Sequence, residues 1–386
     1  MRLQIQILLL ILILPLGLKA VNLDIGIFHS FDKQEIHFTS ITGKYTVLGD
    51  QKEIGEVLKT ITVRVSIFQD SLLNYYIDNK LIGQFHKLQF KGKGFMNAFS
   101  IKINNGPTKT RDYDDDLIIR IFNKKLQLVN RVAIEDYTAG VVQSEALGSS
   151  KDMQFFFVQA ITCRTYALVN YLKHTDEGFN LCDDVHCQFY SRRCHNADIA
   201  RATARTSGMV IVDENKKMIS AAFHSNCGGE TVNSEDVWTI PTSYLKSVVD
   251  TFCTHMPNAH WRYAMLKQDW LDFLKQHYNY PIDNPDMRKQ ALSFQQNERK
   301  SLFENNIPLK TIRHDLHLRS TFFSLENKKD SVIFNGRGYG HGVGLCQQGA
   351  IQMANQGLNY KSIIAFYYTN TSIIHYSELH YNFFTQ

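Results

Sequence analysis

The chain has 386 residues, 44% of them hydrophobic, and a formal net charge of +5 at pH 7. This length and apolar content are sufficient for two or three domains with buried cores. The charge is nearly balanced and no basic run is present, so we expect no nucleic-acid partner. Aromatic residues make up 12% of the chain, which suits either a core or a platform for sugar rings.

Residues 1–20 have the pattern of a secretory signal peptide. Arg2 provides a short basic start, an almost continuous apolar run extends from Ile5 to Leu18, and Ala20 is a small residue before the expected cleavage point. The apolar run is shorter than the ~20 residues that a membrane-spanning helix needs, which makes an uncleaved anchor the lesser alternative. We therefore expect an extracytoplasmic protein, periplasmic or secreted, with no membrane contact after the signal is removed.

Residues 21–127 are predicted to form a β-rich N-terminal region. Short runs of β-branched and aromatic residues, such as LDIGIF, ITVRVSIF and LIIRIF, include several with alternating polar and apolar positions. The sequences DNK and FNKK between such runs are typical of hairpin turns.

The segment from Lys151 to about Lys173 is predicted to be a helix, with Ser149 or Ser150 as its N-cap. Arg164 falls within the apolar face of this helix. One interpretation is that its aliphatic stem packs while its charged end reaches solvent. The other is that this face borders a polar site, because a buried guanidinium needs an acid or carbonyl groups as hydrogen-bond partners.

Residues 251–330 are charged and amide-rich and contain helical pieces such as QDWLDFLKQHY. We interpret them as an inserted helical subdomain. Two short helices, at residues 345–355 and 360–368, are predicted beyond it. The overall prediction is an α+β protein in which residues 128–250 and 331–386 form a mixed α/β core around this insert.

Residues 335–350, NGRGYGHGVGLCQQGA, have glycine at every second position from 336 to 344. In an extended strand this pattern creates one bare face and an opposite face that carries Arg337, Tyr339 and His341. A phosphate-binding loop is excluded because the Lys-Ser/Thr ending is missing. The alternative is a tightly packed crossing that binds no ligand.

Three stretches in this order, VAIEDYTAGVVQSEALGSS, AAFHSNCGGET and GRGYGHGVGLCQQGA, resemble the SpoIID/LytB family of bacterial cell-wall proteins. The resemblance covers residues from about 112 to 369, interrupted by the insert. It implies a lytic transglycosylase that cleaves peptidoglycan glycan strands between N-acetylmuramic acid and N-acetylglucosamine, preferably after removal of stem peptides, and leaves 1,6-anhydro ends. Other members are amidase enhancers, so the alternative is a non-catalytic wall-binding protein that stimulates an N-acetylmuramoyl-L-alanine amidase.

The resemblance places the catalytic acid at Glu145, in the sequence QSEA, where Gln143 replaces the family's proline. One acid suffices in a lytic transglycosylase because the substrate's own C6 hydroxyl is the nucleophile, whereas ordinary glycosidases use two carboxylates. A raised pKa would suit Glu145 as proton donor. From the residues alone, Glu145 is instead a surface acid near a helix start, favoured there by the helix dipole, and Glu135 and Asp136 are rival acids.

By the same resemblance, a further set of residues lines the glycan groove around the acid. In this interpretation the glycines pack against the core, while Arg337, Tyr339 or His341 reach the groove. The implied substrate-binding residues are Arg164, Tyr166, Ser225, Tyr244, Lys246, Arg337, His341 and Gln347.

The loop LCDDVHCQFY resembles a family loop that binds zinc in at least one member. Cys182 and Cys187 would be thiolate ligands, with His186 or His174 as imidazole donors. A short-range disulfide between the two cysteines is the alternative in an oxidising compartment. The zinc would be structural, so we expect no cofactor requirement for catalysis. The spare ligand candidates are Cys194 and His195.

The chain has seven cysteines, an odd number that leaves at least one without a disulfide partner. A disulfide between Cys227 and Cys253 is expected to tie the groove wall to the start of the insert, worth ~3 kcal/mol in the entropic model. Cys163 and Cys346 are interpreted as small buried hydrophobic residues. A third hypothesis is a cysteine peptidase that uses Cys346 or Cys163 with His341, since a helix start at Cys346 would lower its pKa.

Overall fold

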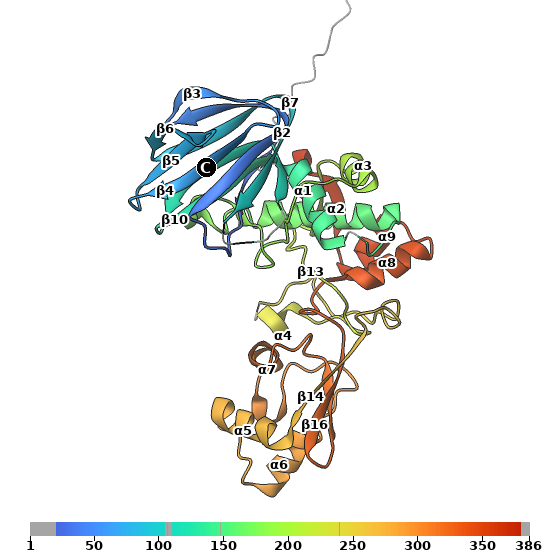
Figure 1. Cartoon of the computed structure of the whole chain (residues 1–386). Coiled ribbons are helices and arrows are strands. Elements are labelled where there is room, and N and C mark those ends of the chain that lie inside the picture. The colour runs from blue at the N-terminus through green and yellow to red at the C-terminus, as the bar shows by residue number, and fades with distance from the viewer. Residues whose placement is uncertain (1–20, 105, 107–109, 147, 239, 380–386) are drawn as a thin grey trace, which may run out of the picture.

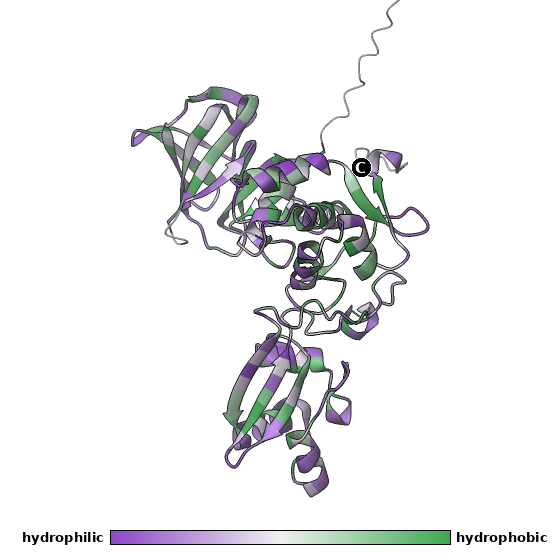
Figure 2. Ribbon diagram, turned by 90° about the vertical axis from the view of Figure 1, so that its right-hand side faces the viewer, coloured by the Kyte–Doolittle hydropathy of each residue, from purple (hydrophilic) through white to green (hydrophobic). Residues whose placement is uncertain are grey.

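The computed structural model describes residues 21–104, 106, 110–146, 148–238 and 240–379. The signal peptide expected at residues 1–20 lies outside these residues. Within them the chain forms a β-rich region, a helical layer and an inserted subdomain, which follow one another from one end of the molecule to the other (Figures 1 and 2). This is the α+β class expected from the sequence. No helix in the described part of the chain is long and apolar enough to cross a membrane.

The β-rich region is built on one sheet, which contains eleven strands within the described residues. Its order is β11-β1-β10-β9-β7-β2-β4-β5-β6, with β3 paired to β2 and β8 paired to β7. Alternate positions of β2 are buried at Ile36, Phe38 and Ser40, as the period-two pattern predicts. Phe38 stacks on Phe90 inside the region, with ring centroids 4.3 Å apart. The strands are β1 (Asn22–Ile27), β2 (Glu35–Gly49), β3 (Lys52–Val57), β4 (Thr62–Phe68), β5 (Leu72–Ile77), β6 (Lys80–Phe85), β7 (Lys87–Ile103), β8 (Arg111–Asp114), β9 (Asp116–Phe122), β10 (Lys125–Ala133) and β11 (Leu181–Cys182).

The helical layer is organised around α2 (Met153–Val169), which contacts the four other helices of the layer. The N-cap of α2 is Asp152, whose side chain accepts a hydrogen bond from the Gln154 amide at 2.7 Å, and not the expected Ser149 or Ser150. The sheet leads directly into this layer, because β10 ends where α1 begins. The other helices are α1 (Ile134–Ala146), α3 (Ala197–Arg205), α8 (Gln347–Asn355) and α9 (Tyr360–Tyr367).

Two pairs of short strands accompany the helical layer. β12 (Met209–Val212) pairs antiparallel with β18 (Ser372–His375), and β13 (Phe223–His224) pairs parallel with β17 (Leu345–Cys346). The pairing of β13 with β17 brings together two of the sequence motifs, on either side of the insert. The short helix α4 (Ser234–Trp238) lies between β13 and the insert in sequence.

The insert has its own hydrophobic core, which is centred on the fully buried Trp270 and includes Phe323 and Phe334. It contains the expected helices and, in addition, a three-stranded antiparallel sheet of order β14-β16-β15. Because β16 is the central strand of this sheet, the chain leaves the insert only after Arg337. The elements are β14 (His260–Leu266), α5 (Lys267–Tyr278), α6 (Pro285–Leu292), α7 (Leu309–Asp315), β15 (Phe323–Asn327) and β16 (Ser331–Arg337).

The glycine stretch is not the extended strand that the alternation predicts. Gly338, Gly340, Gly342 and Gly344 have φ of 79°, 116°, 84° and 69°, which are left-handed values that side chains disfavour. A Cβ atom on Gly338 would lie 2.7 Å from the Asn226 carbonyl oxygen. The stretch is therefore a tightly packed crossing and not a strand, and glycine is required both for backbone conformation and for the close approach of two chain segments.

Candidate active site

A cavity of about 750 Å³ lies where the helical layer meets the insert. It brings together α1, α2, the loop that follows α2, the segment around β13, α4, α7 and the glycine stretch. The three family-like stretches and the cysteine loop LCDDVHCQFY therefore meet at one site, and α7 of the insert contributes Arg313 to it. The lining residues are Glu145, Tyr166, Asn170, Lys173, Val185, His186, Cys187, Ser220, Ala222, Phe223, His224, Ser225, Trp238, Arg313, Tyr339, Gly340, His341 and Gln347.

Glu145 is half-buried at the second-last position of α1, so the interpretation as a surface acid favoured by a helix start is wrong. Burial raises the pKa of Glu145 above the ordinary range of a carboxyl group, and one hydrogen bond from the Phe189 amide, at 3.1 Å, opposes this shift. No ion pair to Glu145 occurs among the described residues. The last turn of a helix also disfavours a negative charge. These conditions keep a proton on the carboxyl group at a higher pH than usual.

The last turn of α1 is fastened to the loop at residues 189–196. Gln143 accepts hydrogen bonds from the amides of His195 and Asn196, at 2.7 and 2.9 Å. Ser144 accepts one from the Ser191 amide at 3.0 Å, and Glu145 accepts one from Phe189. Three consecutive side chains therefore hold one loop, which fixes the orientation of the acid. Gln143, which replaces the proline of the family pattern, takes part in this contact from inside the helix.

Tyr166, Ser225, His341 and Gln347 line the cavity together with Glu145. Burial lowers the pKa of His341 to about 4, so its imidazole is neutral near pH 7. Nε2 of His341 donates to the Phe223 carbonyl at 3.0 Å, and Nδ1 accepts from the Val343 amide at 3.1 Å. Both ring nitrogens are thus occupied by the backbone, and His341 holds the glycine stretch against β13.

Several lining residues were not identified from the sequence, among them His224, Trp238 and Arg313. His224 donates from Nδ1 to the Val343 carbonyl at 3.1 Å, which leaves Nε2 as an acceptor, and this buried atom has no partner among the described residues. Trp238 is 41% exposed and Tyr339 is 45% exposed, so both present ring surface of the kind that packs against sugars. His224 stands inside the motif AAFHSN, so its position was a usable signal, whereas Arg313 belongs to the insert.

Arg164 does not line the cavity, although the resemblance implied that it binds the glycan. Its fully buried guanidinium forms an ion pair with Glu135, at 3.0 Å from Nε to Oε1, and donates to the Met209 and Thr203 carbonyls at 3.1 and 3.3 Å. Glu135 also accepts from the Gly208 amide at 3.1 Å. The pair ties the start of α1 to α2 and to the segment before β12, and it removes Glu135 as a rival acid.

Tyr244, Lys246 and Arg337 are also absent from the lining. The Tyr244 hydroxyl accepts from the Ser220 amide at 3.2 Å, and Lys246 pairs with Glu235 at 2.9 Å. Arg337 turns toward the insert, where it donates to the Gln296 and Asn297 carbonyls at 3.0 and 3.1 Å. Of these three contacts, only that of Tyr244 reaches a lining residue, Ser220.

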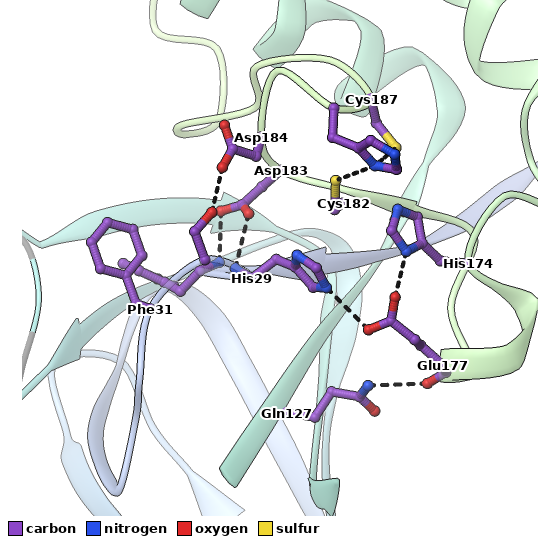
Figure 3. Close-up of polar contacts among 12 residues, drawn as sticks. His29, Phe31, Gln127, His174, Glu177, Cys182, Asp183, Asp184 and Cys187 are labelled. Carbon is purple, nitrogen blue, oxygen red and sulfur yellow. Dashed lines mark hydrogen bonds and ion pairs between the residues drawn. The ribbon is translucent and has the colours of Figure 1, made fainter. Parts of the chain in front are cut away.

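The loop after α2 carries a cluster of four metal-ligand side chains, three of which, His174, Cys182 and Cys187, are labelled in Figure 3. One ligand atom from each of His174, Cys182, His186 and Cys187 lies within 4.8 Å of the others. Nδ1 of His174 is 2.6 Å from a carboxylate oxygen of Glu177, and its buried Nε2 has no partner among the described residues. The four residues are those expected as zinc ligands. Cys194 and His195 are not part of the cluster.

All seven cysteines are free thiols in the structure. The expected Cys227–Cys253 bond is absent, because the two sulfur atoms lie 3.3 Å apart, whereas a disulfide is ~2.05 Å long. Cys163 and Cys346 are buried outside the cavity lining, and burial raises the pKa of both thiols. The cysteine-peptidase hypothesis is therefore wrong, since a nucleophilic thiolate has to be accessible and to have a low pKa.

Comparison with known proteins agrees with the motifs. The family model described as SpoIID, Stage II sporulation protein, matches residues 122–212, which include α1 and α2. An uncharacterized protein of Brachyspira hyodysenteriae is 28% identical over 70% of this chain and 75% of its own length. Stage II sporulation protein D of Bacillus subtilis is 27% identical over 66% of this chain and 78% of its own length. The Amidase enhancer of Bacillus subtilis is 25% identical over 61% of this chain and 40% of its own length.

The fold and the cavity define an α+β protein whose sequence motifs meet around the one carboxylic acid among the described residues that line the cavity. The comparisons identify its similarities more closely: the chain resembles the SpoIID family over residues 122–212 and stage II sporulation protein D over two thirds of its length.

Proposed function

We propose that this protein is an exported peptidoglycan lytic transglycosylase with Glu145 as its general acid and base. The similarity to the SpoIID family, to Stage II sporulation protein D and to the Amidase enhancer supports a function in the bacterial cell wall. The observation that carries the finer proposal is that Glu145 is the only carboxylic acid among the described residues that line the cavity. A glycosidase that uses water needs a second carboxylate, whereas a lytic transglycosylase does not.

In the proposed reaction, the protonated Glu145 carboxyl group donates its proton to the glycosidic oxygen between N-acetylmuramic acid and N-acetylglucosamine. The bond from that oxygen to C1 of N-acetylmuramic acid breaks. The C6 hydroxyl of the same sugar then attacks C1 and returns its proton to the Glu145 carboxylate. The product is a 1,6-anhydro end, and the acid is restored for the next turnover.

The remaining lining residues suit a carbohydrate. Trp238 and Tyr339 present exposed ring faces, and Gln347 has a buried side-chain nitrogen without a partner among the described residues. Such a donor is costly unless a ligand accepts its hydrogen bond. Digestion of purified glycan strands, with and without stem peptides, followed by mass spectrometry of the ends, tests the proposal. Anhydro-muramyl ends support it, whereas intact strands refute it.

The alternative function is non-catalytic: binding to the wall and stimulation of an amidase. It is favoured by the similarity to the Amidase enhancer of Bacillus subtilis. A protein that only binds the wall does not need a buried acid, so the two proposed functions predict different effects of a substitution at Glu145. If the alternative holds, a purified cell-wall amidase should be stimulated equally by the wild type and by Glu145→Gln.

We further propose that the His174, Cys182, His186 and Cys187 cluster binds a structural zinc ion. Two thiolates and two imidazoles are a donor set typical of tetrahedral structural zinc. The Glu177 carboxylate orients His174 through Nδ1 and so leaves Nε2 free to face the cluster. His186 and Cys187 also line the cavity, and Phe189, two residues further on, donates to Glu145. A zinc ion here would fix the loop that orients the acid.

The double variant Cys182→Ser, Cys187→Ser is therefore expected to lose one zinc ion per chain and most of the cleavage activity. Loss of the ligands releases the loop and weakens the Phe189 contact. Elemental analysis of protein purified without chelator measures the metal, and the matched control is Cys194→Ser, which alters a cysteine outside the cluster. An unchanged zinc content in the double variant would contradict zinc binding at this cluster. A Cys182–Cys187 disulfide in the wild type would show that the two cysteines are bonded to each other and not to a metal.

Cleavage is expected to fall as pH rises through the pKa of Glu145, because the first step needs the protonated acid. That pKa is raised above the ordinary value of ~4.3, so the decline begins above this pH. His341 is neutral above about pH 4 and contributes no second decline in this range. The profile of kcat/KM against pH on peptide-free strands measures the effect. A rate that increases with pH across this range would show that the reaction needs a deprotonated group first.

A further inference from the structure

A second group of metal-ligand side chains lies on the far side of the cavity wall, outside the proposed function. It consists of Cys227, Asp250, Cys253 and Cys346. One ligand atom from each lies within 4.8 Å of the others, and all four residues are buried. They come from three separate segments: the loop after β13, the segment that leads into the insert, and the start of α8.

Asp250 is a fully buried carboxylate, and no ion pair to it occurs among the described residues. Its carboxylate accepts hydrogen bonds from the Tyr367 hydroxyl at 2.9 Å and from the Phe252 amide at 3.0 Å. The Cys227 thiol lies 3.3 Å from the same oxygen that Tyr367 contacts. Burial makes the charged form of this carboxyl group strongly unfavourable, and a bound cation would compensate that charge.

The contacts around Cys346 are those expected of a metal-bound thiolate. Its sulfur accepts hydrogen bonds from the amides of Cys227 and Gly349, both at 3.3 Å. Gly349 has no side chain, and a Cβ atom at this position would collide with the Asp250 carboxylate and the Tyr367 hydroxyl. The amides and the tyrosine therefore orient the sulfur and the carboxylate toward one point, as outer contacts orient the ligands of known metal sites.

We propose that Cys227, Asp250, Cys253 and Cys346 bind a second zinc ion. Three soft sulfur donors favour zinc over magnesium or calcium, and four protein ligands make a closed site, which is typical of a structural ion. Binding displaces the thiol protons to solvent and leaves thiolates on the metal. A disulfide between Cys227 and Cys253 would use only two of these donors and would leave the Asp250 carboxylate without a cation.

The position of the site defines what the ion does. Asp250 and Cys253 stand where the chain leaves the core for the insert, and Cys346 follows its return. Ser225, two residues before Cys227, and Gln347, directly after Cys346, both line the cavity. The ion therefore fastens the two chain crossings of the insert to each other and holds one wall of the cavity.

The first zinc site has to be removed to measure the second. In the Cys182→Ser, Cys187→Ser background we expect one zinc ion per chain, falling to none when Cys227→Ser and Cys346→Ser are added. Cys163→Ser in the same background is the matched control, because Cys163 is buried but belongs to neither cluster, and it should keep the ion. Replacement of the zinc by Co²⁺ should produce thiolate-to-cobalt absorption that Cys227→Ser and Cys346→Ser abolish.

A folded background protein that contains no zinc would overturn the proposal, and so would peptide mapping without reductant that shows Cys227 linked to Cys253. If the cysteine variants do not fold, Asp250→Asn preserves the shape of the site and removes only the charged ligand. It is expected to weaken zinc binding at least tenfold in competition with a chelator. Unchanged zinc affinity in this folded variant would also overturn the proposal.

Discussion

Glu145→Gln is expected to lower the rate of glycan cleavage by about 10²–10⁴-fold, the usual cost of removing a general acid. The amide has nearly the shape of the carboxyl group, so binding of the strand should persist. The same substitution should not lower the stability of the fold. Because the folded-state pKa is raised, the favourable contribution of the protonated acid is present below the unfolded pKa and is lost as pH rises through the folded pKa. The variant should therefore be at least as stable as the wild type at neutral pH.

Rates on purified peptide-free strands and thermal unfolding at pH 7 measure both effects. Asp136→Asn is the matched control, because Asp136 is an exposed acid in the first turn of the same helix and lies outside the cavity. It should cleave at the wild-type rate. Normal cleavage by Glu145→Gln would show that Glu145 is not the proton donor.

Arg164→Met is expected to destabilise the fold by about 3 kcal/mol, in the range found when one partner of a buried ion pair is removed. The Arg164 side chain is fully buried, and its loss leaves the Glu135 carboxylate without its positive partner and removes the guanidinium hydrogen bonds to the Met209 and Thr203 carbonyls. Thermal unfolding measures the effect. Cleavage should fall only as far as the folded fraction falls, because Arg164 does not line the cavity.

The double variant Arg164→Met, Glu135→Leu should recover part of the lost stability, since it removes the unpaired acid. Arg201→Ala is the matched control: Arg201 pairs with Asp198 at the surface of α3, where an ion pair contributes little. A near-wild-type melting temperature for Arg164→Met, combined with a large loss of cleavage, would contradict this account and would show that Arg164 takes part in binding or cleavage of the glycan.

The elements that could be predicted from the sequence are those with a local signal. Alternation marked β2, and the short spacing of Cys182, His186 and Cys187 placed three ligand side chains in one loop. The resemblance of QSEA to the family motif indicates Glu145 from the sequence alone. In each case the residues that act together are close in sequence or belong to one recognisable pattern.

What could not be predicted depends on contacts between distant segments. The partner of Arg164 is Glu135, on a different helix, and nothing near Arg164 in sequence indicates this choice. Alternating glycines indicate a strand, but four consecutive glycines of the stretch have positive φ, because the stretch crosses residues 222–228 at close range. Cys346 lies 119 residues from Cys227, so only the folded chain shows their convergence.

Mass spectrometry of the ends produced from peptide-free glycan strands in H₂¹⁸O tests the central claim most directly. If Glu145 transfers the proton and the C6 hydroxyl attacks, each cleavage leaves a 1,6-anhydro-muramyl end without ¹⁸O, and Glu145→Gln produces almost none. A new reducing end that carries one ¹⁸O would show that water is the nucleophile and would contradict the account. Strands left intact by the wild type would contradict it equally and would favour the amidase-enhancer function.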